Sequence, residues 1–227
     1  MIDYASKTPS IPQKLFVILI ELIFIWLAYW IFFLGGQAEV YAWLGKTPQE
    51  IITARKLMIL AFIVFTFFRF ILSMFYLLKR KLRWSETFTL ILPFGIYYLG
   101  YALLTNTGAA WTWWDDLAVL VFLIGSLINT GSELQRHFWK QGHENKGKLY
   151  TEGLFKYAMH INFFGDLLWV TGFAMLTRNI WSIIVPILLL ALFVFFNIPE
   201  LDKYLAAKYD GFDEYARKTK KLIPGIY

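Results

Sequence analysis

Several stretches of about 20 almost wholly apolar residues follow one another along this chain, and a helix of that length crosses a bilayer. We place six of them at roughly 15–34, 57–78, 87–104, 117–130, 153–176 and 180–198. The fourth is short, so its helix is expected to continue to Lys140 beyond the lipid. Pro199 is expected to break the last span, and a charged helix then runs to about Lys208. The pattern predicts an all-α polytopic membrane protein with about six transmembrane helices and a helical tail.

The composition agrees with this class and excludes several others. Of 227 residues, 58% are hydrophobic and 20% aromatic. The chain has no cysteine, which excludes a disulfide, a thiolate metal site and a cysteine nucleophile. The N-terminal residues lack a basic start, a short apolar core and a cleavage site, so we expect no cleaved signal peptide. The whole chain, 1–227, is expected to be one membrane domain.

Lysines and arginines gather at one set of span ends. They follow the second and sixth spans and fill the connection between the fourth and fifth. The connection after the third span has none, and the one after the fifth has only Arg178. The positive-inside rule therefore predicts six spans with both termini in the cytoplasm. This placement explains the net charge of +6 better than binding to nucleic acid does.

Groups that bind charge appear around the connection between the fourth and fifth spans. They are Asn129, Glu133, Arg136, His137, Lys140, His160, Asn162 and Asp166. Such groups are costly at the edge of the membrane, so their concentration there predicts a functional site. The alternative is an ordinary solvated loop between two spans.

Four of these residues share one face of the fourth helix. Asn129, Glu133, Arg136 and Lys140 are three or four residues apart. Arginine binds phosphate oxygens in a fork and lysine binds them as a point charge, so the stripe suits a phosphate-rich ligand. The alternative is a cytoplasmic helix end that merely carries bases.

A second group stands near the start of the fifth span. Asn162 and Asp166 share a helical face, and His160 precedes them. With three histidines in the chain there is no metal-ligand pattern, and we expect no metal. The sequence also lacks G-x-G-x-x-G, P-loop and G-x-S-x-G motifs, so it does not indicate a Rossmann domain, an ATPase or a serine hydrolase.

Glu21 and Arg69 are isolated charges in the first two spans. Either they form a structural ion pair, or Glu21 lines a substrate cavity as a proton donor or a polar anchor. Tyr97, Tyr98 and Tyr101 of the third span are possible phenolic donors, although aromatic packing is the commoner use.

This chain resembles the C-terminal half of the steroid 5-alpha-reductase superfamily in two segments: G-L-F-K-Y-A-M-H-I-N-F-F-G-D-L-L-W-V-T-G-F-A-M-L and Y-D-G-F-D-E-Y-A-R-K-T-K-K-L-I-P-G-I-Y. That superfamily includes steroid reductases, sterol reductases and isoprenylcysteine carboxyl methyltransferases. This chain is most similar to its bacterial reductase-like branch, DUF1295. The resemblance covers about 125–227 and implies a cytoplasm-facing cofactor pocket there, with 1–124 as variable N-terminal spans. It also implies a bacterial inner membrane.

The resemblance implies NADPH as cofactor and hydride transfer to a carbon–carbon double bond of a lipid-like substrate. Glu21, Tyr97 and Tyr98 are then the candidate catalytic residues. Asn162 and Asp166 match the signature N-[YF]-x-G-[DE]. The predicted cofactor-binding residues are Asn129, Glu133, Gln135, Arg136, Lys140, His160, Asn162, Asp166, Glu200, Asp202, Tyr204, Tyr209 and Tyr215.

The chain departs from the family pattern at four positions. The usual R-H-P-N-Y run reads Met159-His160-Ile161-Asn162-Phe163, and Glu200 stands where steroid reductases carry a histidine. The missing arginine and proline fit a methyltransferase using S-adenosylmethionine less well. Three hypotheses remain: the reductase, the methyltransferase and a non-enzymatic lipid-binding protein. The substrate and the oligomeric state are not predicted.

Overall fold

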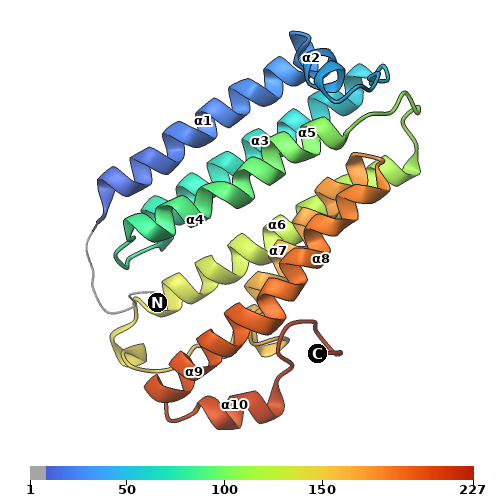
Figure 1. The fold of residues 1–227 in the computed structure, drawn as a ribbon. Coiled ribbons are helices and arrows are strands. Elements are labelled where there is room, and N and C mark those ends of the chain that lie inside the picture. Colours follow the sequence, from blue (N-terminus) through green and yellow to red (C-terminus); the bar gives the residue numbers. More distant parts are fainter. Residues whose placement is uncertain (1–8) are drawn as a thin grey trace. The chain divides into compact units, whose positions relative to one another are not determined.

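The structure is a computed structural model that describes residues 9–227. Residues 1–8, on which the signal-peptide prediction partly rests, lie outside the described residues. The helices are α1 (Ile11–Phe33), α2 (Gly36–Trp43), α3 (Thr53–Leu72), α4 (Trp84–Gly95), α5 (Tyr101–Leu104), α6 (Trp113–Trp139), α7 (Ile161–Leu176), α8 (Ile184–Leu192), α9 (Ile198–Lys208) and α10 (Phe212–Lys218) (Figure 1). Across residues 9–227 there is no strand, and the one isolated bridge joins Ala158 to Lys220.

Short π-helical and 3-10 turns complete the described chain. The π-helical turns are η1 (Ser73–Leu77), η2 (Ile96–Gly100) and η6 (Phe193–Asn197). The 3-10 turns are η3 (His143–Asn145), η4 (Gly153–Lys156) and η5 (Ile180–Ile183). Because η1 extends α3, η2 links α4 to α5, and η6 links α8 to α9, the apolar helices continue through these turns.

Five helices among the described residues are long and apolar enough to cross a membrane: Ile11–Phe33, Thr53–Leu77, Trp84–Leu104, Trp113–Trp139 and Ile180–Lys208. The sixth apolar helix, α7, has 16 residues. Large apolar side chains such as Leu19 and Trp26 on α1 and Phe195 on η6 are exposed. A lipid bilayer covers such surfaces. The predicted all-helical membrane fold is confirmed, and the protein is an integral membrane protein.

The chain forms two compact units. Unit 1 contains the chain up to Asp116 together with Phe173–Ser182. Unit 2 contains Leu117–Gly172 and Ile183–Tyr227. All the residues predicted to bind the cofactor belong to unit 2, whereas Glu21, Tyr97 and Tyr98 belong to unit 1.

In unit 1, α1 packs along α3 and α4.

Unit 1 also contains a buried charge cluster around Asp115. Asp115 Oδ1 lies 3.0 Å from Arg55 Nη2, and Asp115 Oδ2 lies 2.6 Å from Arg178 Nη2. Arg55 also donates to the carbonyl of Ala109 at 2.8 Å. One carboxylate thus joins the start of α3, the start of α6 and the turn after α7. Removal of one partner from a buried ion pair strongly destabilises a protein, so this cluster fixes these three segments of unit 1.

In unit 2, α6 and α7 cross with their backbones almost touching. A Cβ atom added to Gly165 would lie 2.4 Å from the backbone nitrogen of Asn129. A Cβ atom added to Gly125 would lie 2.3 Å from the nitrogen of Trp169, and one added to Gly172 would lie 2.5 Å from that of Phe122. Membrane helices associate by close packing of small residues because lipid offers no hydrophobic drive between them. These glycines set the distance between the two helices.

Two predicted boundaries differ from the structure. The fifth span was expected from about Gly153, but α7 begins at Ile161. Gly153 has a positive φ of 57°, and the N–H groups of Met159 and His160 donate to the carbonyls of Lys220 and Lys221. The backbone before Ile161 is therefore bonded to the tail and is not available for a helix.

Pro199 does not break the last helix as predicted. The apolar helix runs from Ile180 to Lys208. The π-helical turn η6 precedes Pro199, and there the N–H of Ile198 donates to the carbonyl of Phe193, five residues earlier. This shift of the hydrogen-bond register lets a residue without an N–H group enter the next turn.

We expect Gly165→Ala to destabilise unit 2, because the new methyl group forces α6 and α7 apart. Overpacking of this kind costs about 1–3 kcal/mol of unfolding free energy. The control is Gly131→Ala on α6, where an added Cβ meets no atom within 4 Å. The control should unfold at the same or a higher temperature, because alanine favours a helix by about 1 kcal/mol over glycine. Thermal unfolding of both variants in one detergent measures the difference. Equal midpoints would contradict the close crossing.

Candidate functional site

The C-terminal half of α6 carries the predicted polar stripe, and α7 is bonded to it. Asn129 Nδ2 donates to the carbonyl of Asn162 at 3.1 Å. Asn162 Nδ2 in turn donates to Glu133 Oε1 at 2.9 Å. The guanidinium of Arg136 donates to the other oxygen of the same carboxylate. Glu133 therefore fixes both the start of α7 and one cation of the stripe.

Arg136 also contacts the segment before α7. Its guanidinium carbon lies 5.3 Å from the centre of the Phe155 ring. The carbonyl of Phe155 accepts a hydrogen bond from the Tyr215 hydroxyl at 2.5 Å. Burial raises the pKa of Tyr215, and the nearby charge of Arg136 opposes this shift. Helix α10, which carries Tyr215, is thus bonded close to Arg136.

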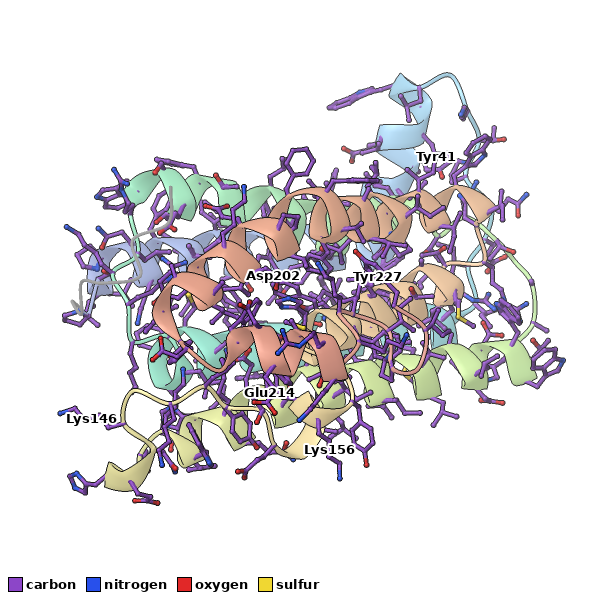
Figure 2. The ribbon with its side chains drawn as sticks, turned by 90° about the horizontal axis from the view of Figure 1, so that it is seen from below. Tyr41, Lys146, Lys156, Asp202, Glu214 and Tyr227 are labelled. Atoms are coloured by element: carbon purple, nitrogen blue, oxygen red, sulfur yellow. The ribbon has the colours of Figure 1, made fainter. Side chains whose placement is uncertain are left out.

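A second polar group joins α7, α9 and the tail. The ring nitrogen Nε2 of His160 lies 2.8 Å from Asp202 Oδ1, and Lys221 Nζ lies 3.2 Å from Asp202 Oδ2. His160 is 1% exposed, and its ring stacks on Phe163 with 5.6 Å between the ring centres. Figure 2 labels Asp202 on α9. We call these three residues the His160–Asp202–Lys221 clasp, because they tie the tail to the start of α7.

Three cations gather at the end of the stripe. The pKa of Lys140 is lowered to about 8, first by burial and then by the positive charges of Arg136 and Lys208, while Glu133 opposes the shift. Lys140 as a whole residue is exposed, so the burial that lowers its pKa concerns the ammonium group at the end of the side chain. Lys208 Nζ donates to the Tyr204 hydroxyl at 2.7 Å and lies 5.3 Å from the centre of the Tyr209 ring.

The remaining predicted residues have other contacts. Gln135 Oε1 accepts a hydrogen bond from the N–H of Leu154 at 2.9 Å. Asp166 accepts one from Trp169 Nε1 at 2.8 Å. Glu200 is exposed on α9.

Sequence reasoning missed Lys208, Lys221 and Phe155. The two lysines were counted only toward membrane topology. For Lys208 a signal was present, because Tyr204 precedes it by four residues and so shares its helical face. Lys221 and Phe155 had no such signal, since their contacts join segments that are far apart in the sequence.

The predicted catalytic residues meet within unit 1. The Tyr98 hydroxyl donates to Glu21 Oε2 at 3.0 Å, and both residues are 0% exposed. Glu21 Oε1 is buried without a hydrogen-bond partner among the described residues. Arg69 interacts electrostatically with Tyr98. The hydrogen-bond partner of Glu21 is therefore Tyr98, a pairing that the sequence did not specify.

Tyr97 directly precedes Tyr98 in the π-helical turn η2. Its ring stacks on Tyr101 with 6.3 Å between the ring centres, so its aromatic body is used in packing. Turns of this kind frequently occur at functional sites.

The cations of unit 2 fit an anionic cofactor. Burial lowers the pKa of Lys140 first, and repulsion by the positive charges of Arg136 and Lys208 lowers it further. A polyanion would relieve this repulsion, and the planar guanidinium and the point-like ammonium groups suit phosphates. The aromatic rings of Phe155, Tyr204 and Tyr209 lie within cation–π range of these charges.

No curated protein matches the sequence of this chain. The model of a family described as "Protein of unknown function (DUF1295)" matches residues 86–219, which is more than half of the chain. The matched region includes every residue of the polar stripe. The chain therefore belongs to DUF1295, a steroid 5-alpha-reductase-like family.

Proposed function

We propose that this protein is a membrane reductase that uses NADPH to reduce a carbon–carbon double bond in a steroid, a sterol or another lipid. The observation that carries the proposal is the gathering of three cations in unit 2, where the charges of Arg136 and Lys208 act on Lys140. A cofactor with several phosphates fits this charge better than S-adenosylmethionine, which is itself a cation. Membership of a steroid 5-alpha-reductase-like family supports the same choice.

The residues have separate roles in the proposed reaction. Arg136, Lys140 and Lys208 bind phosphates, and Asn129, Glu133 and Asn162 hold the start of α7 against α6. Bound NADPH supplies a hydride, that is, one proton and two electrons. The second carbon of the double bond needs a proton, and we assign its donation to the Glu21–Tyr98 pair. In this proposal the protein lies in a bacterial inner membrane with both termini cytoplasmic.

Replacement of Arg136 and Lys140 by alanine should lower the affinity for NADPH by about 100-fold or more, since a hydrogen bond to a charged group is worth roughly 1.5–3 kcal/mol. The control is Lys146→Ala, because Lys146 is exposed and is not among the charges that shift the pKa of Lys140. Thermal shift of the detergent-purified variants with NADPH, NADH and S-adenosylmethionine measures the effect.

Each result of this titration has a definite meaning. Stabilisation by NADPH that Lys146→Ala retains and Arg136→Ala/Lys140→Ala loses supports the reductase. Stabilisation by S-adenosylmethionine alone would replace it with the methyltransferase. Absence of any shift in the wild-type protein would favour the non-enzymatic lipid-binding protein.

NADPH affinity should also depend on pH through Lys140. Its pKa of about 8 in the free protein means that the ammonium is charged below this pH and neutral above it. Phosphates bind the charged form, so the affinity should fall as the pH rises through 8. Lys140→Arg keeps its charge at all these pH values because the pKa of arginine is above 12, so it should remove most of the fall. Equal pH profiles for the two proteins would show that Lys140 does not contact the cofactor.

Glu21→Gln and Tyr98→Phe should each reduce substrate-dependent NADPH oxidation by about 10²-fold or more, because a general acid contributes about 10²–10⁴-fold to a rate. NADPH affinity should stay at the wild-type value in both variants. Tyr29→Phe serves as the control, since Tyr29 is an exposed phenol on the same helix as Glu21. Normal turnover in either variant would show that the replaced residue does not take part in donating the proton.

A further inference from the structure

Two hydroxyl groups on α6 are buried without a hydrogen-bond partner. They belong to Ser126 and Thr130, and Ser126 is 2% exposed. The two residues are four apart, so they share a face of the helix. Both lie in unit 2 on α6, before Glu133, Arg136 and Lys140 of the polar stripe.

Other hydroxyls in the described helices behave differently. Thr171 donates to the carbonyl of Leu167 at 2.6 Å, Thr105 to that of Tyr101 at 2.7 Å, and Ser132 to that of Asn129 at 2.9 Å. Serine and threonine can satisfy their hydroxyls in this way within a helix. Ser126 and Thr130 do not, and in unit 1 the same holds for Thr66. A buried polar group that leaves such a bond unmade needs an explanation, and a ligand provides one.

The surrounding charges limit what that ligand group is. The next ionised residue along the stripe is Glu133, and its two oxygens already bind Asn162 and Arg136. A neutral group therefore suits Ser126 and Thr130 better than an ion does. Each hydroxyl donates one hydrogen bond, and a carbonyl oxygen accepts two.

We propose that the Ser126 and Thr130 hydroxyls bind the carbonyl oxygen of a ligand, an inference that rests on the proposed reductase function. Thr130 stands ten residues before Lys140, which is about 15 Å along the helix axis. Helix α6 thus carries the cations assigned to phosphate toward its C-terminal end and these two neutral hydroxyls before them. The carbonyl has two possible sources, the carboxamide of a nicotinamide ring or the carbonyl of a lipid enone.

Cysteine reactivity tests this site because the chain has no cysteine of its own. Ser126→Cys and Thr130→Cys should react with methyl methanethiosulfonate, a small neutral reagent, if their hydroxyls face a ligand site. Ser132→Cys is the matched control, since Ser132 is on the same helix, is 0% exposed and donates its hydroxyl to the carbonyl of Asn129. We expect the first two to react at least about 10-fold faster than the control, which reacts only by local opening. Intact mass in detergent reports the rate.

Protection then identifies the source of the carbonyl. The three probes are NADPH, 2′,5′-ADP, which keeps phosphates but lacks nicotinamide, and testosterone as an enone lipid. Protection by NADPH and not by 2′,5′-ADP assigns the carboxamide. Protection by testosterone assigns the carbonyl of the lipid.

Two results would overturn the proposal. Ser126→Cys and Thr130→Cys could be as slow as Ser132→Cys, which would mean that they lie in a closed core. They could also react quickly without protection by NADPH or testosterone, which would leave only trapped water at the site. Failure of the reductase proposal is seen separately, as the absence of any thermal shift of the wild-type protein with NADPH. Protection by testosterone would still support the carbonyl site in that case.

Stability of the free protein provides a second measurement. Ser126→Ala/Thr130→Val removes two unpaired hydroxyls, so it should unfold at the same or a higher temperature than the wild type. Thr171→Val loses a made hydrogen bond and should unfold at a lower temperature. A drop for the double variant larger than that for Thr171→Val would show that Ser126 and Thr130 serve the core, and the proposal would fall.

Discussion

The close contact of α6 with α7 is the constraint on which unit 2 depends. Gly125, Gly165 and Gly172 let the two backbones meet at a distance that any Cβ atom would prevent. This distance brings Asn129 within 3.1 Å of the Asn162 carbonyl and lets Asn162 reach Glu133. In lipid, each of these polar groups needs a partner, so the packing and the hydrogen bonds support each other. The polar stripe is ordered because the glycines are small.

The cations at the end of the stripe lie close enough for their charges to interact. Burial lowers the pKa of Lys140 first, and the positive charges of Arg136 and Lys208 lower it further. Local conflicts of this kind concentrate at functional sites, where a ligand compensates them. The Glu133 carboxylate offsets part of the repulsion, and the Tyr204 and Tyr209 rings lie under Lys208.

Unsatisfied polar atoms also mark the membrane-buried part of each unit. Glu21 Oε1 in unit 1 and the hydroxyls of Ser126 and Thr130 in unit 2 are buried without partners. By contrast, the Asp115 carboxylate accepts three hydrogen bonds from two arginines, although Arg55 Nε in the same cluster is itself buried without a partner.

The sequence by itself determined the helical membrane fold, because runs of about 20 apolar residues have no other stable form in a bilayer. It also determined the composition of the stripe, since the spacing of Asn129, Glu133, Arg136 and Lys140 follows the helical repeat. Only the tertiary structure decided the pairing of Glu21 with Tyr98, the clasp of His160 with Asp202 and Lys221, and the start of α7 at Ile161. These contacts join residues that are distant in sequence, and local periodicity carries no information about which of them meet. The same reason applies to Ser126 and Thr130, whose lack of partners is a property of the packed helix and not of the residue type.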